Sequence, residues 1–98
     1  TYRGSLEIGL LSLLERAVLA AYEMGDLDRA IDLSARAARI DPADGGLLER
    51  LAILLDEGGA TVSARRAARR ALLLLDDLSI TPNPHLRRIS GGQDPSLK

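Results

Sequence analysis

Apolar residues recur along this chain at intervals of three and four, the spacing that places side chains on one face of an α-helix. The clearest case runs from Leu27 to Ile40, where one face carries Leu27, Ala30, Ile31, Ala37 and Ala38. Gly25 ends the preceding helix, Asp26 caps the new one through its carboxylate, and Pro42 prevents its continuation. The pattern therefore predicts a helix with defined ends and an apolar face that needs a partner.

The same reasoning predicts four more helical segments, which together indicate an all-α chain. They run from a cap at Ser5 to about Met24, from a cap at Asp44 to about Gly58, from Thr61 or Ser63 to about Leu78, and, as a short turn, from His85 to Ile89. Residues 90–98 are rich in glycine, serine and polar residues, so we expect a disordered tail there.

The first predicted helix has apolar residues on more than one face, which is typical of a helix buried on several sides. These residues are Leu6, Ile8, Leu10, Leu11, Leu13, Leu14, Ala17, Val18, Leu19, Ala20 and Ala21. Because the chain begins with Thr1 rather than Met, we expect a fragment of a longer polypeptide, whose upstream helices would cover this one. A second copy of the chain is the alternative cover, with Leu10 and Leu13 as the candidate self-association residues.

An internal repeat arranges these helices in pairs. Gly25 and Gly59 are 34 residues apart (59 − 25), and the same shift relates Ala30 to Ala64, Ala37 to Ala71, Leu14 to Leu48 and Ala21 to Leu55. A period of about 34 is typical of tetratricopeptide repeats, which are stacked helical hairpins. We therefore predict an all-α, tetratricopeptide-like, right-handed stack of two antiparallel hairpins, with four main helices and a short fifth.

Composition limits the function classes. Hydrophobic residues make up 46% of the chain and charged residues 28%, with no Cys, Phe or Trp. A core of leucine and alanine favours helices, and the absence of cysteine removes disulfides and thiolate chemistry and suits the cytoplasm. The formal net charge of −1 provides no overall attraction to nucleic acid or to a membrane surface. No apolar run reaches the length of a membrane span, since Glu7, Glu15 and Arg16 interrupt the first helix.

Two segments resemble a known family. Residues 20–44 look like a tetratricopeptide unit, and residues 72–89 resemble the closing segment of the bacterial transcriptional activator domain, most clearly at Pro82, Pro84, Leu86 and Arg87. The resemblance implies a tetratricopeptide-like domain of a bacterial transcriptional regulator over residues 1–89, without the upstream helices that the family has. In antibiotic regulatory proteins a DNA-binding winged helix precedes this domain, and none is present here.

The sequence also departs from the family pattern at three positions. Ser34 and Ala68 stand where a large aromatic residue is common, and Asp76 stands where the second repeat would otherwise have proline.

In tetratricopeptide hairpins the first helix of each pair lines a concave surface, and the resemblance assigns that surface to the first and third predicted helices. The predicted partner-binding residues are Glu15, Leu19, Tyr22, Glu23, Glu49, Ile53, Asp56 and Glu57, with Ser12 and Gly46 beside them. Their carboxylates lie on one stripe of each helix, so we expect an acidic groove with an apolar floor. Such a groove favours a basic, amphipathic protein segment or a neighbouring domain. The alternative is ordinary surface charge.

Arginines gather on the second helix of each pair. They are Arg29, Arg36 and Arg39 on one, and Arg65, Arg66, Arg69 and Arg70 on the other. Phosphate contacts with a nucleic acid are one interpretation, but the stripe has no aromatic stacking partner and the chain has no net positive charge. We therefore expect a solvated outer face and no direct nucleic-acid binding.

No pattern of a catalytic site or cofactor site is visible. His85 is the only histidine, and Ser12, Ser34 and Ser63 lie in or at the start of predicted helices with no second base. The glycine pairs are not followed by the lysine of a phosphate-binding loop. The sequence thus predicts a non-catalytic protein-interaction module without metal or cofactor, with self-association or a general adaptor role unrelated to transcription as alternatives.

Overall fold

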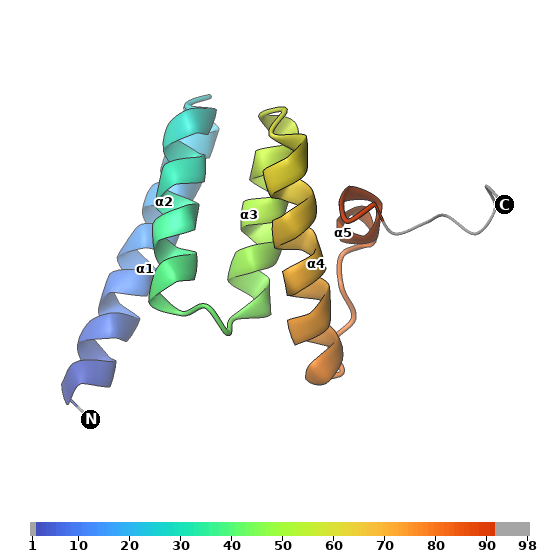
Figure 1. Ribbon diagram of the computed structural model, residues 1–98. Coiled ribbons are helices and arrows are strands. Elements are labelled where there is room, and N and C mark those ends of the chain that lie inside the picture. Colours follow the sequence, from blue (N-terminus) through green and yellow to red (C-terminus); the bar gives the residue numbers. More distant parts are fainter. Residues whose placement is uncertain (1, 92–98) are drawn as a thin grey trace, which may run out of the picture.

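The computed structural model describes residues 2–91, and the side chains of residues 8–91. It contains α1 (Tyr2–Glu23), α2 (Leu27–Ile40), α3 (Gly45–Glu57), α4 (Thr61–Asp77) and α5 (Pro84–Ile89). The four main helices form two antiparallel hairpins, α1 with α2 and α3 with α4, and the hairpins stand side by side through α2 and α3 (Figure 1). The predicted all-α fold of paired helices with a short fifth is confirmed.

The predicted helix ends are mostly confirmed. Asp26 Oδ1 accepts the backbone N–H of Arg29 at 3.2 Å, and Asp44 Oδ1 accepts those of Gly46 at 2.9 Å and Leu47 at 3.2 Å. These bonds use backbone donors that have no partner within the helix. Ser5 was predicted as a cap, and this is wrong, because α1 already begins at Tyr2.

Two glycines one repeat apart take the same backbone conformation. Gly25 has a φ of +79° and Gly59 a φ of +83°, and each follows the first helix of its hairpin. Side chains with a Cβ rarely adopt this left-handed region, so glycine ends these helices at low cost. The repeat seen in the sequence is therefore a repeat of backbone geometry.

Alanine dominates the contact between paired helices. Ala30 of α2 and Ala64 of α4, which are one repeat apart, are both 0% exposed. A small side chain at these positions lets two helix backbones approach closely. Ser34 and Ala68, the positions where the family commonly has an aromatic residue, are also buried.

The short helix α5 covers the outer side of the second hairpin. Leu86 is 0% exposed and packs with Ile89 into the core that α3 and α4 form. The linker before α5 is held where the backbone N–H of Asn83 donates to Glu49 Oε2 at 2.9 Å. After α5, Arg69 Nε donates to the carbonyl oxygen of Ser90 at 3.1 Å. Ser90 is buried, so the packed structure continues one residue past the predicted boundary at 89, whereas tail residues 92–98 lie outside the described residues.

At the opposite edge, the outer side of α1 has no covering helix in the part of the chain that is described. Leu10 is 47% exposed and Leu13 is 59% exposed on this side. Within the described residues, none of the helices is long and apolar enough to cross a membrane.

Candidate functional site

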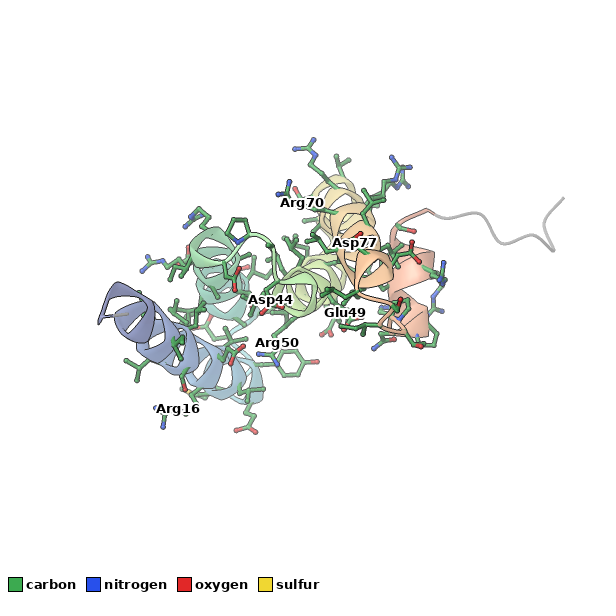
Figure 2. All side chains as sticks on the ribbon, turned by 90° about the horizontal axis from the view of Figure 1, so that it is seen from below. Arg16, Asp44, Glu49, Arg50, Arg70 and Asp77 are labelled. Carbon is green, nitrogen blue, oxygen red and sulfur yellow. The ribbon has the colours of Figure 1, made fainter. Side chains whose placement is uncertain are left out.

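A cleft of about 310 Å³ lies between α1 and α3, the first helices of the two hairpins. Its lining consists of Val18, Leu19, Tyr22, Gly46, Glu49, Arg50, Ile53, Leu54 and Glu57. Helix α2 packs against both α1 and α3, so it holds the two helices apart while leaving this space on one side of them. In the view along the helices, Glu49 and Arg50 lie on the side of the molecule opposite to Arg70 (Figure 2).

The cleft brings together most of the predicted groove. Leu19, Tyr22, Glu49, Ile53 and Glu57 line it, and Gly46 lies beside them as expected. Helical spacing explains this convergence, because residues three, four and seven apart share one side of a helix. Glu15, Glu23 and Ser12 of α1 do not line the cleft; Glu15 is half-buried, and the other two are exposed.

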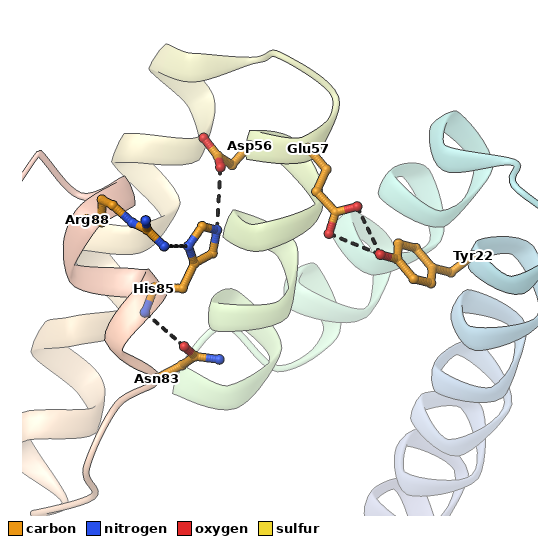
Figure 3. Close-up of polar contacts among 6 residues, drawn as sticks. All are labelled: Tyr22, Asp56, Glu57, Asn83, His85 and Arg88. Atoms are coloured by element: carbon orange, nitrogen blue, oxygen red, sulfur yellow. Dashed lines mark hydrogen bonds and ion pairs between the residues drawn. The ribbon is translucent and has the colours of Figure 1, made fainter.

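Tyr22 and Glu57 join the two sides of the cleft. The Tyr22 hydroxyl donates to Glu57 Oε1 at 3.0 Å and to Oε2 at 3.2 Å (Figure 3). The hydrogen bond to Glu57, together with the negative charge of that carboxylate and some desolvation, raises the pKa of Tyr22 above its ordinary value of 10.0. The pair thus links the C-terminal ends of α1 and α3.

Asp56 belongs to a different surface from the one predicted for it. Its Oδ2 lies 3.5 Å from Nε2 of His85, so the side chain is directed to α5 and not into the cleft (Figure 3). His85 Nδ1 lies 2.6 Å from a guanidinium nitrogen of Arg88, which can only donate. That contact places the imidazole proton on Nε2, facing Asp56. The predicted groove residue is therefore part of the α5 docking contact.

Arg50 lines the cleft, and the sequence interpretation missed it. It comes four residues after Gly46 and three before Ile53, a spacing that puts all three on one side of α3. Helical periodicity within α3 therefore contains the signal that places Arg50 in the cleft. The cleft is consequently acidic on balance rather than uniformly, with the carboxylates of Glu49 and Glu57 against one guanidinium.

The arginines of α4 occupy the face away from the cleft. Arg65, Arg66, Arg69 and Arg70 are all exposed. Arg66 and Arg70 border a shallow apolar hollow of about 530 Å³, whose other walls include Leu51 and Leu55. On α2, Arg36 Nε forms an ion pair with Asp32 at 3.2 Å.

The candidate reactive side chains do not form a site of their own. His85 is engaged by Asp56 and Arg88, and Ser34 Oγ is buried in the α2 core without a hydrogen-bond partner among the described residues. Within residues 2–91, no group of three or more histidine and acidic side chains is arranged to hold a metal ion.

Comparison of the sequence with protein-family models and with curated proteins finds no match.

Proposed function

We propose that this chain is a non-catalytic interaction module whose α1–α3 cleft binds a basic, amphipathic segment of a protein. The observation that carries the proposal is an apolar floor bordered by carboxylates between two packed hairpins. An amphipathic helix fits such a site by placing its apolar face on the floor and its basic side chains at the rim.

The floor offers apolar surface that a ligand can cover. Leu19 is 51% exposed and Tyr22 is 46% exposed, and half-buried Ile53 lies across from them. Removing such surface from water is the main favourable term in most protein associations. A bound apolar side chain would therefore be stabilised in the cleft without a change in the packing of the hairpins.

The carboxylates at the rim of the cleft favour a positively charged ligand. Glu57 is exposed, and among the described contacts its carboxylate accepts hydrogen bonds from the Tyr22 hydroxyl alone. Glu49 is half-buried, and its Oε2 accepts the backbone N–H of Asn83. Positively charged groups of a ligand are favoured beside these carboxylates. Arg50 is the single positive residue of the lining, and it could pair with an acidic residue of the ligand.

For the biological setting we infer a bacterial transcriptional regulator, in which the cleft holds a partner protein or a neighbouring domain of the same polypeptide. The support is the resemblance of residues 20–44 and 72–89 to the bacterial transcriptional activator domain, together with the paired-helix fold. A general adaptor role outside transcription uses the same cleft and differs only in the partner.

A designed peptide tests the cleft directly. The probe is a fluorescent helical peptide with leucines on one face and lysines on the other, titrated into the full chain and followed by anisotropy. Glu57→Lys is expected to weaken binding by about tenfold or more, because it reverses the charge at the rim. Asp77→Lys, an equal charge change at an exposed position of α4 outside the cleft, is the matched control and should bind as the parent does.

Two results would contradict the proposal. One is the absence of peptide binding to the parent chain, and the other is equal weakening by Glu57→Lys and Asp77→Lys, which would indicate attraction by overall charge. A version of the peptide with glutamate in place of lysine should not bind.

A further inference from the structure

The outer edge of α1 carries an apolar stripe with the spacing of a coiled-coil seam. Its residues are Leu10, Leu13, Ala17, Ala20 and Met24, which follow one another at intervals of three, four, three and four. Regular spacing of this kind is typical of two helices packed against each other. Met24 continues the helical turn, because its backbone N–H donates to the Ala20 carbonyl at 3.1 Å.

This stripe is separate from both surfaces of α1 described above. Val18 and Ala21 face α2 and are buried, while Leu19 and Tyr22 face the cleft. The stripe lies on a third side: Leu13 is 59% exposed, Met24 is 83% exposed, and Ala20 is also exposed. None of the five side chains lines the cleft, and all are exposed except Ala17, which is half-buried against the core that α1 and α2 form.

We propose that two copies of this chain pair along the stripe, with α1 antiparallel to α1 of the second copy. The stripe is self-complementary in that orientation, because Ala17 then faces Ala20 of the second copy, and Leu13 faces its Met24. Small residues at the centre let the two backbones approach closely, and large residues on either side close the seam. By symmetry each contact occurs twice.

Charges beside the stripe select this arrangement. Arg16 and Glu23 are exposed, seven residues apart, and flank the stripe on the side away from α2. In the register just described, Arg16 of each copy lies near Glu23 of the other. Moving the register by one heptad brings Ala17 opposite Leu13 and sets the two Arg16 side chains against each other. Opposite charges at flanking positions determine register in helix pairs, so the first arrangement is favoured.

The fold also explains why such pairing stops at two copies. Helix α5 covers the far side of the second hairpin and buries Leu86 there, so the two ends of the molecule present different surfaces. A contact that uses the same surface of both copies is complete once made, whereas a head-to-tail contact would continue into a filament. We therefore infer a two-fold symmetric dimer.

Sedimentation velocity of the full chain over a range of concentrations tests the dimer. The parent is expected to dimerise, and Leu13→Glu should raise the dissociation constant by about tenfold or more, because it places a charge inside an apolar seam. Ile8→Glu is the matched control, since Ile8 lies on the same helix, is 70% exposed and lies outside the stripe. Circular dichroism shows whether each variant keeps its helices. A parent that stays monomeric, or equal loss of dimer in both variants, overturns the proposal.

Cysteine cross-linking tests orientation and register, because the chain has no cysteine of its own. An equimolar mixture of Leu13→Cys and Met24→Cys chains should form an intermolecular disulfide on mild oxidation. Each variant alone should not, since identical positions are about 16 Å apart along an antiparallel pair, at about 1.5 Å per residue. Cross-linking of Leu13→Cys with itself would indicate a parallel pair and overturn the arrangement. Both experiments leave Glu57 intact, so their outcome is independent of peptide binding in the cleft.

Discussion

The hydroxyl of Tyr22 donates to both carboxylate oxygens of Glu57, at 3.0 Å and 3.2 Å, across 35 residues of sequence. Tyr22 lies in the last turn of α1 and Glu57 is the last residue of α3, so the bond links the two hairpins at one end of the cleft. A ligand that enters there meets a carboxylate already oriented by the phenol. The same contact is thus structural support and part of the candidate binding surface.

This hydrogen bond is expected to make the fold less stable at alkaline pH, where the Tyr22 hydroxyl loses its proton. Glu57 raises the pKa of Tyr22, first by accepting its hydrogen bond and then through its negative charge. A folded-state pKa above the unfolded one stabilises the fold fully below the ordinary pKa of 10.0, and the contribution is lost as pH rises through the folded-state pKa. Ultraviolet titration of a Tyr2→Phe chain, where Tyr22 is the remaining tyrosine, should show a midpoint of phenolate formation above pH 10.0.

Two further variants identify the cause of that raised pKa. Adding Glu57→Gln should return the phenol toward its ordinary pKa, because the charge is removed and the acceptor is weaker. Adding Glu23→Gln, which removes an exposed carboxylate from the neighbouring position on α1, should leave the titration as it was. Equal titration curves in all three chains would show that Glu57 does not control Tyr22.

The fold was predictable where its determinants are local. Gly25 and Gly59 end their helices in the left-handed region, and Asp26 and Asp44 accept backbone donors of the helices that follow them. Each of these features depends on residues within one turn of the helix end, so the sequence pattern contains them. The prediction of Ser5 as a cap failed because a serine hydroxyl permits a helix to start without requiring it. The helix already begins at Tyr2, three residues before Ser5.

Arg50 was missed although helical periodicity contains it, whereas the outcomes at Asp56 and Glu49 depend on contacts between distant segments. Asp56 has the periodicity of a groove residue, yet His85 of α5 lies beside it and directs it away from α1. Glu49 does line the cleft, but one of its oxygens is taken by Asn83. The place where α5 docks determines both outcomes, and helical periodicity within α3 contains no information about it.

Docking of α5 is expected to contribute substantially to stability. Leu86 is 0% exposed in the core of the second hairpin, so Leu86→Ala removes buried methyl groups and leaves a cavity. Such changes reduce the free energy of unfolding by about 2–5 kcal/mol. Leu78→Ala removes the same atoms from a residue that is 62% exposed and should change the free energy by under about 0.5 kcal/mol. Urea unfolding at one fixed protein concentration measures both, and similar losses would contradict the packing of α5.

Two helical glycines, Gly9 within α1 and Gly45 at the start of α3, should respond oppositely to replacement by alanine. A Cβ at Gly9 meets nothing within 4 Å, so Gly9→Ala should stabilise the chain by about 0.5–1 kcal/mol through helix propensity. A Cβ at buried Gly45 would lie 2.9 Å from both Cγ and Cδ2 of Leu75 and 3.3 Å from Cβ of Leu74. Gly45→Ala therefore forces α3 away from α4 and should destabilise by about 1–3 kcal/mol. A stabilising Gly45→Ala would show that the hairpin tolerates wider spacing.

Ser34 should be replaceable by alanine with a gain in stability. It is 3% exposed, and its Oγ is buried without a hydrogen-bond partner among the described residues, at a position where the resembled family commonly has an aromatic side chain. A buried hydroxyl without a partner costs about 1–3 kcal/mol, and Ser34→Ala removes it while leaving space no larger than one oxygen atom. Ser12→Ala is the control, because Ser12 is an exposed helical serine and its replacement gains only the difference in helix propensity, under about 0.5 kcal/mol.

In paired urea unfolding curves the midpoint should rise more for Ser34→Ala than for Ser12→Ala, with unchanged slopes. A lower midpoint for Ser34→Ala than for the parent would mean that the hydroxyl finds a partner in solution and contributes to the contact of α2 with its neighbours.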